Sequence, residues 1–338
     1  MTDTPYAGTP LGNPAWLAHR YDPTHDAVHF VSFDRAARNK APFLTDAEMG
    51  PATPMILARA DAVGTMPAPA PLHFIFHSAY CCSTLLARAL DVPGVATALK
   101  EPQILNDLVG WRHRGAPSVA VVPVLSASLD LLARPFEAGE KVIIKPSNVV
   151  NGLIGPILRA RPSANAILLY APLPSFVASI ARKGLWGRLW VRDLLSKQLL
   201  DGLVQLGFEQ RDYFLLTDLQ VAAVGWLAQH ALFTRIANAA PDRVAMLDSE
   251  TLIAEPRDTL TQIARRFGLD LQTAAIEDIV TREFARDAKT GRNFTSGQRA
   301  REREAGQAVH RDEIDKVAIW AAEVAKAAGV VMPAPVTG

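Results

Sequence analysis

Short apolar runs alternate with longer helical patterns along most of this chain, and that alternation restricts its fold more than any other feature. Each run is bounded by turn-forming residues, as a buried strand is, and the segments between the runs have the spacing of helices. The five predicted strands are residues 72–76, 95–99, 142–144, 166–170 and 243–247. Strands that alternate with helices usually pair in parallel, with the helices covering the sheet. The sequence therefore predicts an α/β fold built on a parallel β-sheet flanked by helices.

The remaining segments divide the chain into three parts. Residues 1 to about 65 carry scattered aromatic side chains with turn formers between them, which predicts an irregular N-terminal extension packed on the core. The stretch MPAPAP at residues 66–71 ends this extension. We therefore expect an extension over 1–70, the α/β domain over 71–300, and a C-terminal helix and tail over 301–338. The predicted helices are 83–90, 173–206, 217–240, 256–267 and 298–326.

Composition and charge exclude several classes of function. Hydrophobic residues make up 49% of the 338 residues and charged residues 20%, which is typical of a globular protein and not of a disordered chain. The 35 Lys and Arg against 34 Asp and Glu give a net charge of +1, so the chain as a whole is not attracted to nucleic acid or anionic lipid. We expect no nucleic-acid partner, and any anion site has to be local.

The cysteines and the apolar segments indicate a protein of a reducing compartment. Cys81 and Cys82 are the only cysteines, and adjacent cysteines cannot link distant parts of a chain. The N-terminal residues lack the apolar core of a secretory signal. Residues 62–87 carry no charge but contain three prolines and two histidines, so we reject them as a membrane span. We expect a cytoplasmic protein without a membrane span.

The first candidate site is the segment FIFHSAYCCSTLLARAL, an apolar strand that runs through a loop of small residues into a helix. Such a turn directs backbone N–H groups and the helix N-terminus at one point, where a phosphate or sulfate group binds. The alternative is an ordinary strand-to-helix turn in which Ser83 is the N-cap. A Walker A motif is absent, because His77, Cys82 and Ser83 stand where it needs two glycines and a lysine. This disfavours an ATP or GTP hydrolase.

Five segments, in order, resemble those of PAPS-dependent sulfotransferases, which transfer a sulfuryl group from 3′-phosphoadenosine 5′-phosphosulfate (PAPS). The loop is similar to the 5′-phosphosulfate-binding loop of the bacterial members, which reads like R-x-G-S-T-L-L after a strand. The other segments are LKEPQILN at 99–106, KVIIKPSN at 141–148, NAILLYAPLPSFVASIARKG at 165–184 and RVAMLDSETLIAEPRDTLTQIARRFGL at 243–269. The resemblance covers about residues 72–300 and implies a P-loop nucleoside triphosphate hydrolase-like architecture with PAPS as the cofactor.

The same resemblance implies a set of cofactor-binding residues. In the loop they are His77, Ser78, Ala79, Tyr80, Cys81, Cys82, Ser83 and Thr84. Segment 165–184 matches the family's 3′-phosphate-binding part, which implies Ser179 and Arg182. Arg292 lies in AKTGRNFTSGQRARERE, where the family has a late basic loop that closes over the nucleotide. The alternative for this stretch is a solvated loop followed by a charged helix.

Three positions depart from the family pattern. Tyr80 stands where most members have Lys or Arg, and Cys82 stands where they have glycine. Ala171 stands eight residues before Ser179, where the family places its 3′-phosphate arginine. A bound nucleotide with several negative charges would need replacement donors. Arg182, Lys183 and Arg188 are the nearest candidates in the sequence.

Two residues are candidates for catalysis. Sulfuryl transfer needs a base for the acceptor's proton, positive charge for the transferring oxygens, and in-line positioning, as phosphoryl transfer does. Glu101 follows the second predicted strand, where the resembled enzymes that use a carboxylate base have it; its alternative is a surface carboxylate at a helix start. Lys145 ends a predicted strand at the sheet edge where α/β proteins bind ligands. Its alternative is a lysine that extends from the sheet into solvent.

Other chemistries find little support in the sequence. No CxxC or HxxxH spacing accompanies the two cysteines, so we expect no metal site. A helix N-terminus can activate a cysteine such as Cys82, but no other residue suggests that chemistry. Trp186 and Trp190 are four residues apart on one helical face, which indicates core or interface positions rather than adenine stacking.

The sequence thus predicts a sulfotransferase that moves a sulfuryl group from PAPS to a hydroxyl or amine of a small-molecule, glycan or peptide acceptor. We expect the acceptor cleft to be formed by the N-terminal extension and residues 100–125 and 185–215. The missing cations at Tyr80 and Ala171 favour an alternative, a sulfotransferase-like protein that binds a ligand or partner without catalysis. A nucleotide-dependent kinase is a further alternative, disfavoured by the absent P-loop lysine. An active PAPS site requires several basic side chains near the loop.

Overall fold

The fold is described by a computed structural model that covers residues 11–284 and 296–333. Its centre is a five-stranded, wholly parallel sheet in the order β5-β6-β4-β7-β8. The strands are β4 Leu72–His77, β5 Ala96–Lys100, β6 Lys141–Lys145, β7 Ala166–Tyr170 and β8 Val244–Asp248. All five predicted strands are confirmed to within one or two residues at their ends, and the predicted α/β fold class is confirmed with them.

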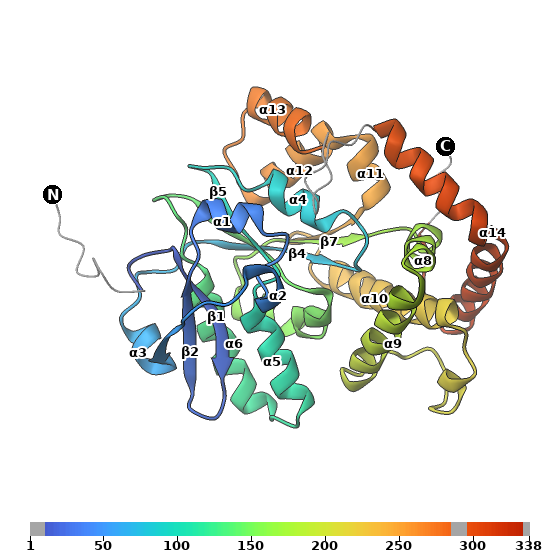
Figure 1. The fold of residues 1–338 in the computed structure, drawn as a ribbon, viewed down its shortest axis with the longest axis horizontal. Coiled ribbons are helices and arrows are strands. Elements are labelled where there is room, and N and C mark those ends of the chain that lie inside the picture. The colour runs from blue at the N-terminus through green and yellow to red at the C-terminus, as the bar shows by residue number, and fades with distance from the viewer. Residues whose placement is uncertain (1–10, 285–295, 334–338) are drawn as a thin grey trace.

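Helices cover both faces of the sheet, so its inner strands are apolar along their length. Figure 1 shows α4, α12 and α13 on one side of the sheet and α5 and α6 on the other. The alternation of side chains divides the core: Ile75, Ile143 and Ile167 face the cluster that includes α4, while Phe74 and Ile144 face the second cluster. The helices of the sheet region are α4 Ser83–Ala89, α5 Gln103–His113, α6 Ser118–Leu132, α7 Ile154–Ala160, α8 Leu173–Arg182, α9 Gly184–Leu200, α10 Asp218–Ala239, α11 Ser249–Ala254, α12 Pro256–Phe267, α13 Thr273–Glu283 and α14 Ser296–Ala327.

The helix predictions were correct in type and wrong in two details. The stretch 173–206 is two helices, because the chain reverses at Gly184, whose φ of +58° ends α8 and begins α9. The sequence analysis also missed α5, α6 and α7, which cover the second face of the sheet. By contrast α12 begins at Pro256 and ends before Gly268 as predicted, with Gly268 in the left-handed region. No helix in the described residues is long and apolar enough to cross a membrane.

The N-terminal extension is regular, which corrects the prediction of an irregular segment. Strands β1 Trp16–Asp22, β2 Ala27–Ser32 and β3 Met55–Ala58 form an antiparallel sheet. Three short helices accompany them, α1 Arg35–Lys40, α2 Asp46–Met49 and α3 Arg59–Gly64. The turn formers between the scattered aromatics connect strands of a hairpin, and Phe30 and Leu17 pack into the core beneath α5 and α6.

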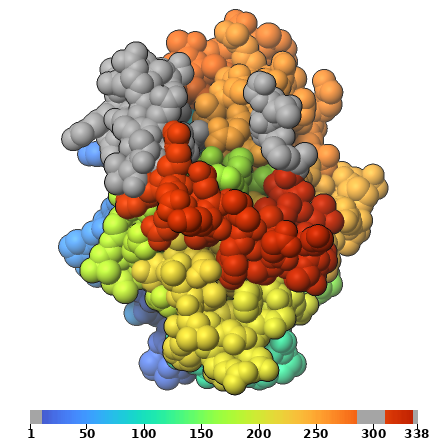
Figure 2. Space-filling model, turned by 90° about the vertical axis from the view of Figure 1, so that its right-hand side faces the viewer, coloured from blue at the N-terminus to red at the C-terminus, as the bar shows by residue number. Residues whose placement is uncertain are grey.

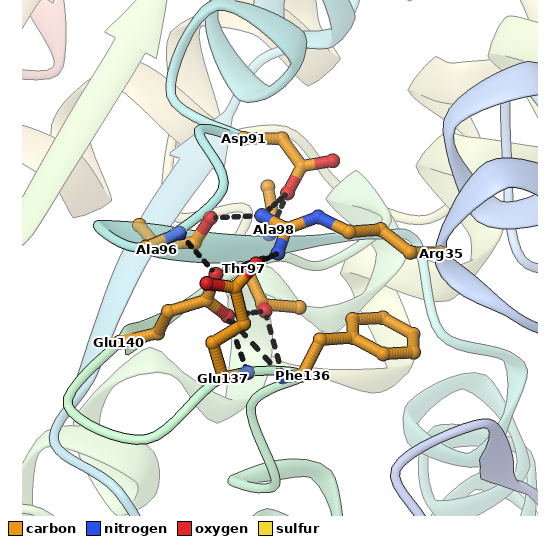
Figure 3. A network of polar contacts seen from close by, with 9 residues as sticks. Arg35, Asp91, Ala96, Thr97, Ala98, Phe136, Glu137 and Glu140 are labelled. Atoms are coloured by element: carbon orange, nitrogen blue, oxygen red, sulfur yellow. Dashed lines mark hydrogen bonds and ion pairs between the residues drawn. The ribbon is translucent and has the colours of Figure 1, made fainter.

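A buried polar network fastens this extension to the edge strand β5. Arg35 donates to the Glu140 carboxylate at 2.5 Å, to Asp91 at 3.0 Å and to the Ala96 carbonyl at 2.8 Å (Figure 3). The Glu140 side chain is fully buried and also accepts from Thr97 and from the backbone N–H of Gly94. These donors hold the pKa of Glu140 below its usual range against the effect of burial. Arg35 therefore compensates the negative charges of two buried carboxylates, and its hydrogen bond to the Ala96 carbonyl fixes the start of β5.

Replacing Arg35 by alanine leaves the Glu140 and Asp91 carboxylates without their cation, and removing one partner of a buried ion pair costs about 3–5 kcal/mol. We expect Arg35→Ala to lower the free energy of unfolding in urea by that amount. Lys316→Ala removes an exposed helical pair with Asp312 and is the matched control, with an expected loss below about 0.5 kcal/mol. Equal losses in the two variants would contradict the role of Arg35.

Burial of His230 makes stability depend on pH. His230 stacks on Trp226 with ring centroids 4.7 Å apart, and burial lowers its pKa to about 4. Between pH 6.5 and 4 His230 binds a proton in the unfolded chain but not in the folded chain, so stability falls as pH falls through this range. We expect the melting temperature of His230→Phe to fall less than that of the wild type between pH 7 and pH 5. Parallel pH profiles of the two proteins would contradict this assignment.

Candidate functional site

Three neighbouring strands end with chemically active side chains at the same edge of the sheet. β5 ends at Lys100, β6 at Lys145 and β4 at His77, and Lys100 lies opposite Lys145 in the parallel register. In open α/β sheets ligands bind outside the carboxyl ends of the strands. All three side chains project from the sheet face that α4 covers, because they alternate with the residues of the opposite core cluster. The sheet thus brings two lysines and a histidine together beside the loop.

Lys145 and Glu101, the two predicted catalytic residues, form an ion pair. The Lys145 ammonium donates to the Glu101 carboxylate, and the Glu101 backbone N–H donates to the Lys145 carbonyl at 2.6 Å. The Lys145 side chain is 1% exposed and lies 4.9 Å from the centre of the Phe43 ring, whereas the Glu101 side chain is 16% exposed. Lys145 is therefore a buried cation, which excludes the alternative of a lysine extending into solvent. Glu101 keeps an open edge at which its carboxylate can accept a proton.

The backbone at Glu101 is strained. Its φ of +54° lies in the left-handed region, which costs a residue with a side chain about 1–2 kcal/mol. The conformation turns the carboxylate back over the end of β6, toward Lys145 and His77, and not along the helix that follows. A surface carboxylate at a helix start needs no such conformation, so the strain indicates a specific position for Glu101.

His77 also lies beside Glu101. Its Nδ1 accepts the Ala79 backbone N–H at 3.1 Å, which places the ring proton on Nε2. Nε2 lies 3.7 Å from Glu101 Oε1, the oxygen that Lys145 also contacts. The His77 carbonyl accepts from Asn151, whose amide also donates to Gln229 at 2.9 Å. The structure places His77 at the end of β4 and not within the loop as predicted. The His77 ring therefore lies next to the Glu101 carboxylate, at a distance longer than a hydrogen bond.

The loop between β4 and α4 has three residues in the left-handed region that are not glycine. They are Ala79, Tyr80 and Cys82, with φ of +72°, +51° and +61°. Hydrogen bonds to the end of β7 hold this conformation: the Ser78 N–H donates to the Leu169 carbonyl at 3.0 Å. Successive residues in such conformations turn their N–H groups toward one side and form a concave anion site. The loop has the shape of a phosphate-binding turn without the glycines that usually form one.

The helix after the loop begins one residue earlier than an N-cap at Ser83 requires. Cys82 is the N-cap of α4, its side chain makes no capping hydrogen bond, and Ser83 and Thr84 are the first helical residues. The alternative in which Ser83 caps an ordinary strand-to-helix turn is therefore excluded. The first N–H groups of a helix have no partner within the helix, and a cap such as Ser or Asp normally accepts from one of them. With no side-chain cap, this end of α4 is suited to an external acceptor.

The surroundings of the two cysteines give no support for covalent or metal chemistry in the described part of the chain. Burial raises the pKa of the Cys81 thiol to about 12, so it remains protonated and donates weakly to the Leu169 carbonyl. Cys82 is partly buried against the α4-side core. Within the residues that the structure describes, no group of three His, Cys, Asp or Glu side chains lies close enough to hold a metal ion.

Lys100 is a site residue that the sequence analysis missed. Its side chain is almost fully buried and donates to the Asn39 carbonyl of the N-terminal extension at 3.1 Å. Burial, together with the nearby positive charges of Arg88 and Lys145, lowers its pKa to about 8. The signal was available, because Lys100 follows a predicted strand as Lys145 does. The strand ends thus contribute two buried lysines, whereas Arg88 stands in the last turn of α4 and is paired with Glu283.

The predicted 3′-phosphate residues Ser179 and Arg182 make their hydrogen bonds within α8. The Ser179 hydroxyl donates within α8 to the Ser175 carbonyl at 2.9 Å, and the exposed Arg182 donates to Ser179 at 3.4 Å. Arg188, a suggested replacement donor, is paired with Asp218 and Glu313. Ala171 is buried and its carbonyl accepts from Trp226 at 2.8 Å. Arg292 lies outside the described residues.

A separate cleft of about 530 Å³ lies between β8 and α12. Its lining consists of Asn165, Ile167, Asp242, Ala245, Met246, Leu247, Thr259, Gln262, Ile263, Arg265 and Arg266. It contains none of the predicted site residues, and it reaches Asn165 just before β7, at the end of the sheet opposite the loop. The charges, strain and strand ends all point to the loop edge, so we assign the candidate site there and not to this cleft.

Comparisons with known proteins found several sulfotransferase structures. No protein-family model and no curated protein matches this chain. Sulfotransferase STF9 from Mycobacterium avium is 14% identical with a TM-score of 0.43, over 76% of this chain and 79% of that one. Sulfotransferase STF1 from Mycobacterium tuberculosis H37Rv is 15% identical with a TM-score of 0.42, over 66% and 76%. The sulfotransferase domain of the curacin biosynthetic pathway is 14% identical with a TM-score of 0.39, over 66% and 81%. Likeness at this level does not assign an activity, and the site residues have to do so.

The strain in the loop gives a stability prediction. Glycine adopts a φ of +72° without a steric penalty, so Ala79→Gly relieves the left-handed strain and we expect it to raise the free energy of unfolding by about 1 kcal/mol. Ala87→Gly, in the middle of α4, is the matched control and is expected to lose about 1 kcal/mol or more. Chemical denaturation measures both. A loss of stability in Ala79→Gly would show that the loop is not strained.

Proposed function

We propose that this protein is a sulfotransferase that moves a sulfuryl group from PAPS to a hydroxyl or amine acceptor. One observation carries the proposal: the buried Lys145–Glu101 pair stands at the carboxyl edge of the sheet, beside a left-handed loop that opens a helix. The pair supplies a cation and a base, and the loop supplies backbone donors for an anion. The five sequence segments that resemble the family place these same residues in its order.

The residues present fit the phosphosulfate end of PAPS. The N–H groups of Ser78 and Ala79 are already paired with the Leu169 carbonyl and His77 Nδ1. The backbone N–H groups from Tyr80 to Thr84, with the Ser83 and Thr84 hydroxyls, would hold the 5′-phosphosulfate. Lys145, near Cys81 of the loop, and the neighbouring Lys100 would supply positive charge in place of the family's basic residue, which Tyr80 replaces. The proposed 3′-phosphate contacts from Ser179, Arg182 and Arg292 rest on the sequence resemblance alone.

The proposed chemistry is a single displacement. PAPS supplies a sulfuryl group on a good leaving phosphate, so the acceptor oxygen or nitrogen bonds to sulfur as the sulfur–oxygen bond to that phosphate breaks. Glu101 takes the acceptor's proton, and the electron pair of the broken bond remains on the phosphate oxygen. Lys145 places positive charge where this oxygen becomes negative. The His77 ring lies beside this carboxylate, with Nε2 3.7 Å from Oε1.

The N-terminal extension completes the site. The Phe43 ring lies against the Lys145 ammonium, and the Asn39 carbonyl accepts from Lys100. The Lys100 carbonyl accepts the Leu44 N–H at 2.7 Å, and the Leu44 carbonyl accepts the Gln103 N–H at 3.0 Å. These contacts exclude water from the two lysines, which strengthens their electrostatic effect on a bound anion. The extension therefore contributes to the reaction site as well as to the fold.

Removing the base or the cation tests these roles. We expect Glu101→Gln and Lys145→Ala each to lower turnover by about 10²–10⁴-fold, measured as release of 3′-phosphoadenosine 5′-phosphate from PAPS with a panel of alcohols, phenols and amines. Circular dichroism spectra of the variants check that they fold.

Matched control variants change the same residue types on exposed helices. Glu277→Gln on α13 and Lys316→Ala on α14 carry no role in the site, and we expect wild-type turnover from both. Wild-type turnover in Glu101→Gln and Lys145→Ala would overturn the proposed roles. A kinase is distinguished in the same assay, because it would release ADP from ATP and Mg²⁺ and leave PAPS intact.

A further inference from the structure

The cleft between β8 and α12 is a second concave region of the molecule, apart from the loop edge. Its volume of about 530 Å³ lies in the range of small-molecule sites in proteins. β8 is an edge strand, so within the described residues no further strand pairs with its outer side. Ala245 lies on the side of β8 that faces α12, and its single methyl group leaves space beneath the helix. In Figure 2 the orange segment that contains α11, α12 and α13 forms the upper part of the surface, above the red α14.

The stripe of α12 that borders this cleft is mainly polar. It consists of Thr259, Gln262, Ile263 and Arg266, at the spacing that puts helical residues on one side. The neighbouring face of the same helix, which packs on the core, is apolar by contrast. A helix that only covered the edge of the sheet would gain most from apolar side chains along this border. The polar stripe therefore indicates a role other than packing.

Polar groups around the cleft have hydrogen-bonding capacity that the protein does not use. Thr259 is only 5% exposed, yet its hydroxyl has no hydrogen-bond partner among the described residues. Buried hydroxyls normally have one. The Asn165 amide N–H donates to the Arg266 carbonyl at 2.7 Å, which fixes the side chain, while its Oδ1 and the Gln262 amide have no partner in the same part of the chain. These groups are placed to bind a molecule inside the cleft.

The charged residues of the cleft favour an anion. Arg265 is exposed and has no carboxylate partner among the residues that the structure describes. Arg266 donates to the Asp242 carbonyl at 3.1 Å and is likewise not paired with a described carboxylate. The Asp242 side chain is the one acidic group of the lining, so the lining carries a net positive charge. Guanidinium groups bind phosphate and carboxylate oxygens through paired N–H donors.

We propose that this cleft binds a small organic phosphate, with its phosphate group on Arg265 and Arg266 and its apolar part on Ile167, Ala245 and Ile263. Ile167 and Ile263 are each 3% exposed and give the cleft an apolar floor. Two guanidinium groups match the double charge of a phosphate monoester. A carboxylate carries half that charge and faces the same repulsion from Asp242, so it fits the cleft less well.

This site is separate from the proposed donor site and does not rest on the proposed function. Asn165 borders the cleft just before β7 begins, whereas the loop is held by the Leu169 carbonyl near the other end of β7. Four residues of a strand span roughly 13 Å. A phosphate bound on Arg265 and Arg266 is therefore not the phosphate of a nucleotide bound at the loop, and the protein can hold both ligands at once.

Calorimetric titration with phenyl phosphate tests the proposal. Its ring fits the apolar floor and its phosphate fits the arginines, and an excess of 3′-phosphoadenosine 5′-phosphate keeps the loop occupied. We expect the wild-type protein to bind phenyl phosphate under these conditions, and Arg265→Gln to lower the affinity about tenfold or more. Arg257→Gln is the matched control, because Arg257 is exposed on the same helix outside the lining, and we expect wild-type affinity from it.

A second variant fills the cleft without touching its charges. Ala245→Leu places a larger side chain in the existing space, so we expect it to abolish the binding of phenyl phosphate while the melting temperature stays at or above that of the wild type. Arg265 lies on the surface, so the Arg265→Gln result does not depend on whether Ala245→Leu folds.

Four results would overturn the proposal: no binding of phenyl phosphate by the wild-type protein, equal affinities of Arg265→Gln and Arg257→Gln, loss of binding when 3′-phosphoadenosine 5′-phosphate is added, or equally tight binding of the uncharged benzyl alcohol. The nucleotide titration keeps the two proposals apart. Binding of phenyl phosphate that depends on Arg265, in a protein that does not bind 3′-phosphoadenosine 5′-phosphate, would overturn the proposed function and leave the cleft site standing. Nucleotide binding without binding in the cleft would do the reverse.

Discussion

The buried ion pair between Lys145 and Glu101 is the interaction on which the rest of the site depends. An ammonium group that is 1% exposed needs a compensating charge, since an unpaired buried charge is among the most costly features a protein can have. The pair is possible only because β5 and β6 lie in register, which puts Glu101 one residue beyond the strand that adjoins Lys145. The Phe43 ring closes the remaining side. The sheet register and the N-terminal extension are therefore parts of the same electrostatic arrangement.

Strain and charge coincide at this edge of the sheet. Four non-glycine residues there, Ala79, Tyr80, Cys82 and Glu101, have left-handed backbone conformations, and only one other such residue, Asp26, occurs in the described chain. Backbone strain persists where surrounding contacts impose it, and it is most frequent at functional sites. Here the contacts are the β7 carbonyl that holds Ser78 and the Lys145 carbonyl that holds Glu101. Lys100 and Lys145 add buried positive charge to the same small region. The cleft beside β8 is lined by the charged residues Asp242, Arg265 and Arg266, but none of its lining residues has a left-handed backbone.

Much of the sheet and part of the site could be predicted from the sequence. Buried parallel strands appear in the sequence as short apolar runs, so β4 and β7 were predicted almost to the residue. Lys145 was proposed because it stands at a strand end, and Glu101 because of the resemblance to the sulfotransferases. The β1–β2 hairpin was missed because the turn-forming residues between its aromatic side chains were taken as a sign of irregular structure. Left-handed conformations at Ala79 and Cys82 leave no trace in the sequence, since alanine and cysteine do not favour them. The Tyr80–Trp190 contact also depends on how α9 packs, which spacing along the chain cannot show.

Thermal unfolding with nucleotides tests the central claim most directly, namely that the loop and the Lys145–Glu101 pair form the site of a phosphosulfate donor. Both 3′-phosphoadenosine 5′-phosphate and ATP with Mg²⁺ should be added, in parallel, to the purified protein. A ligand at about 100 times its dissociation constant adds roughly 2.7 kcal/mol of stability, which raises the melting temperature visibly. The account predicts a rise with 3′-phosphoadenosine 5′-phosphate and none with ATP. No response to either nucleotide, or a response to ATP alone, would contradict it.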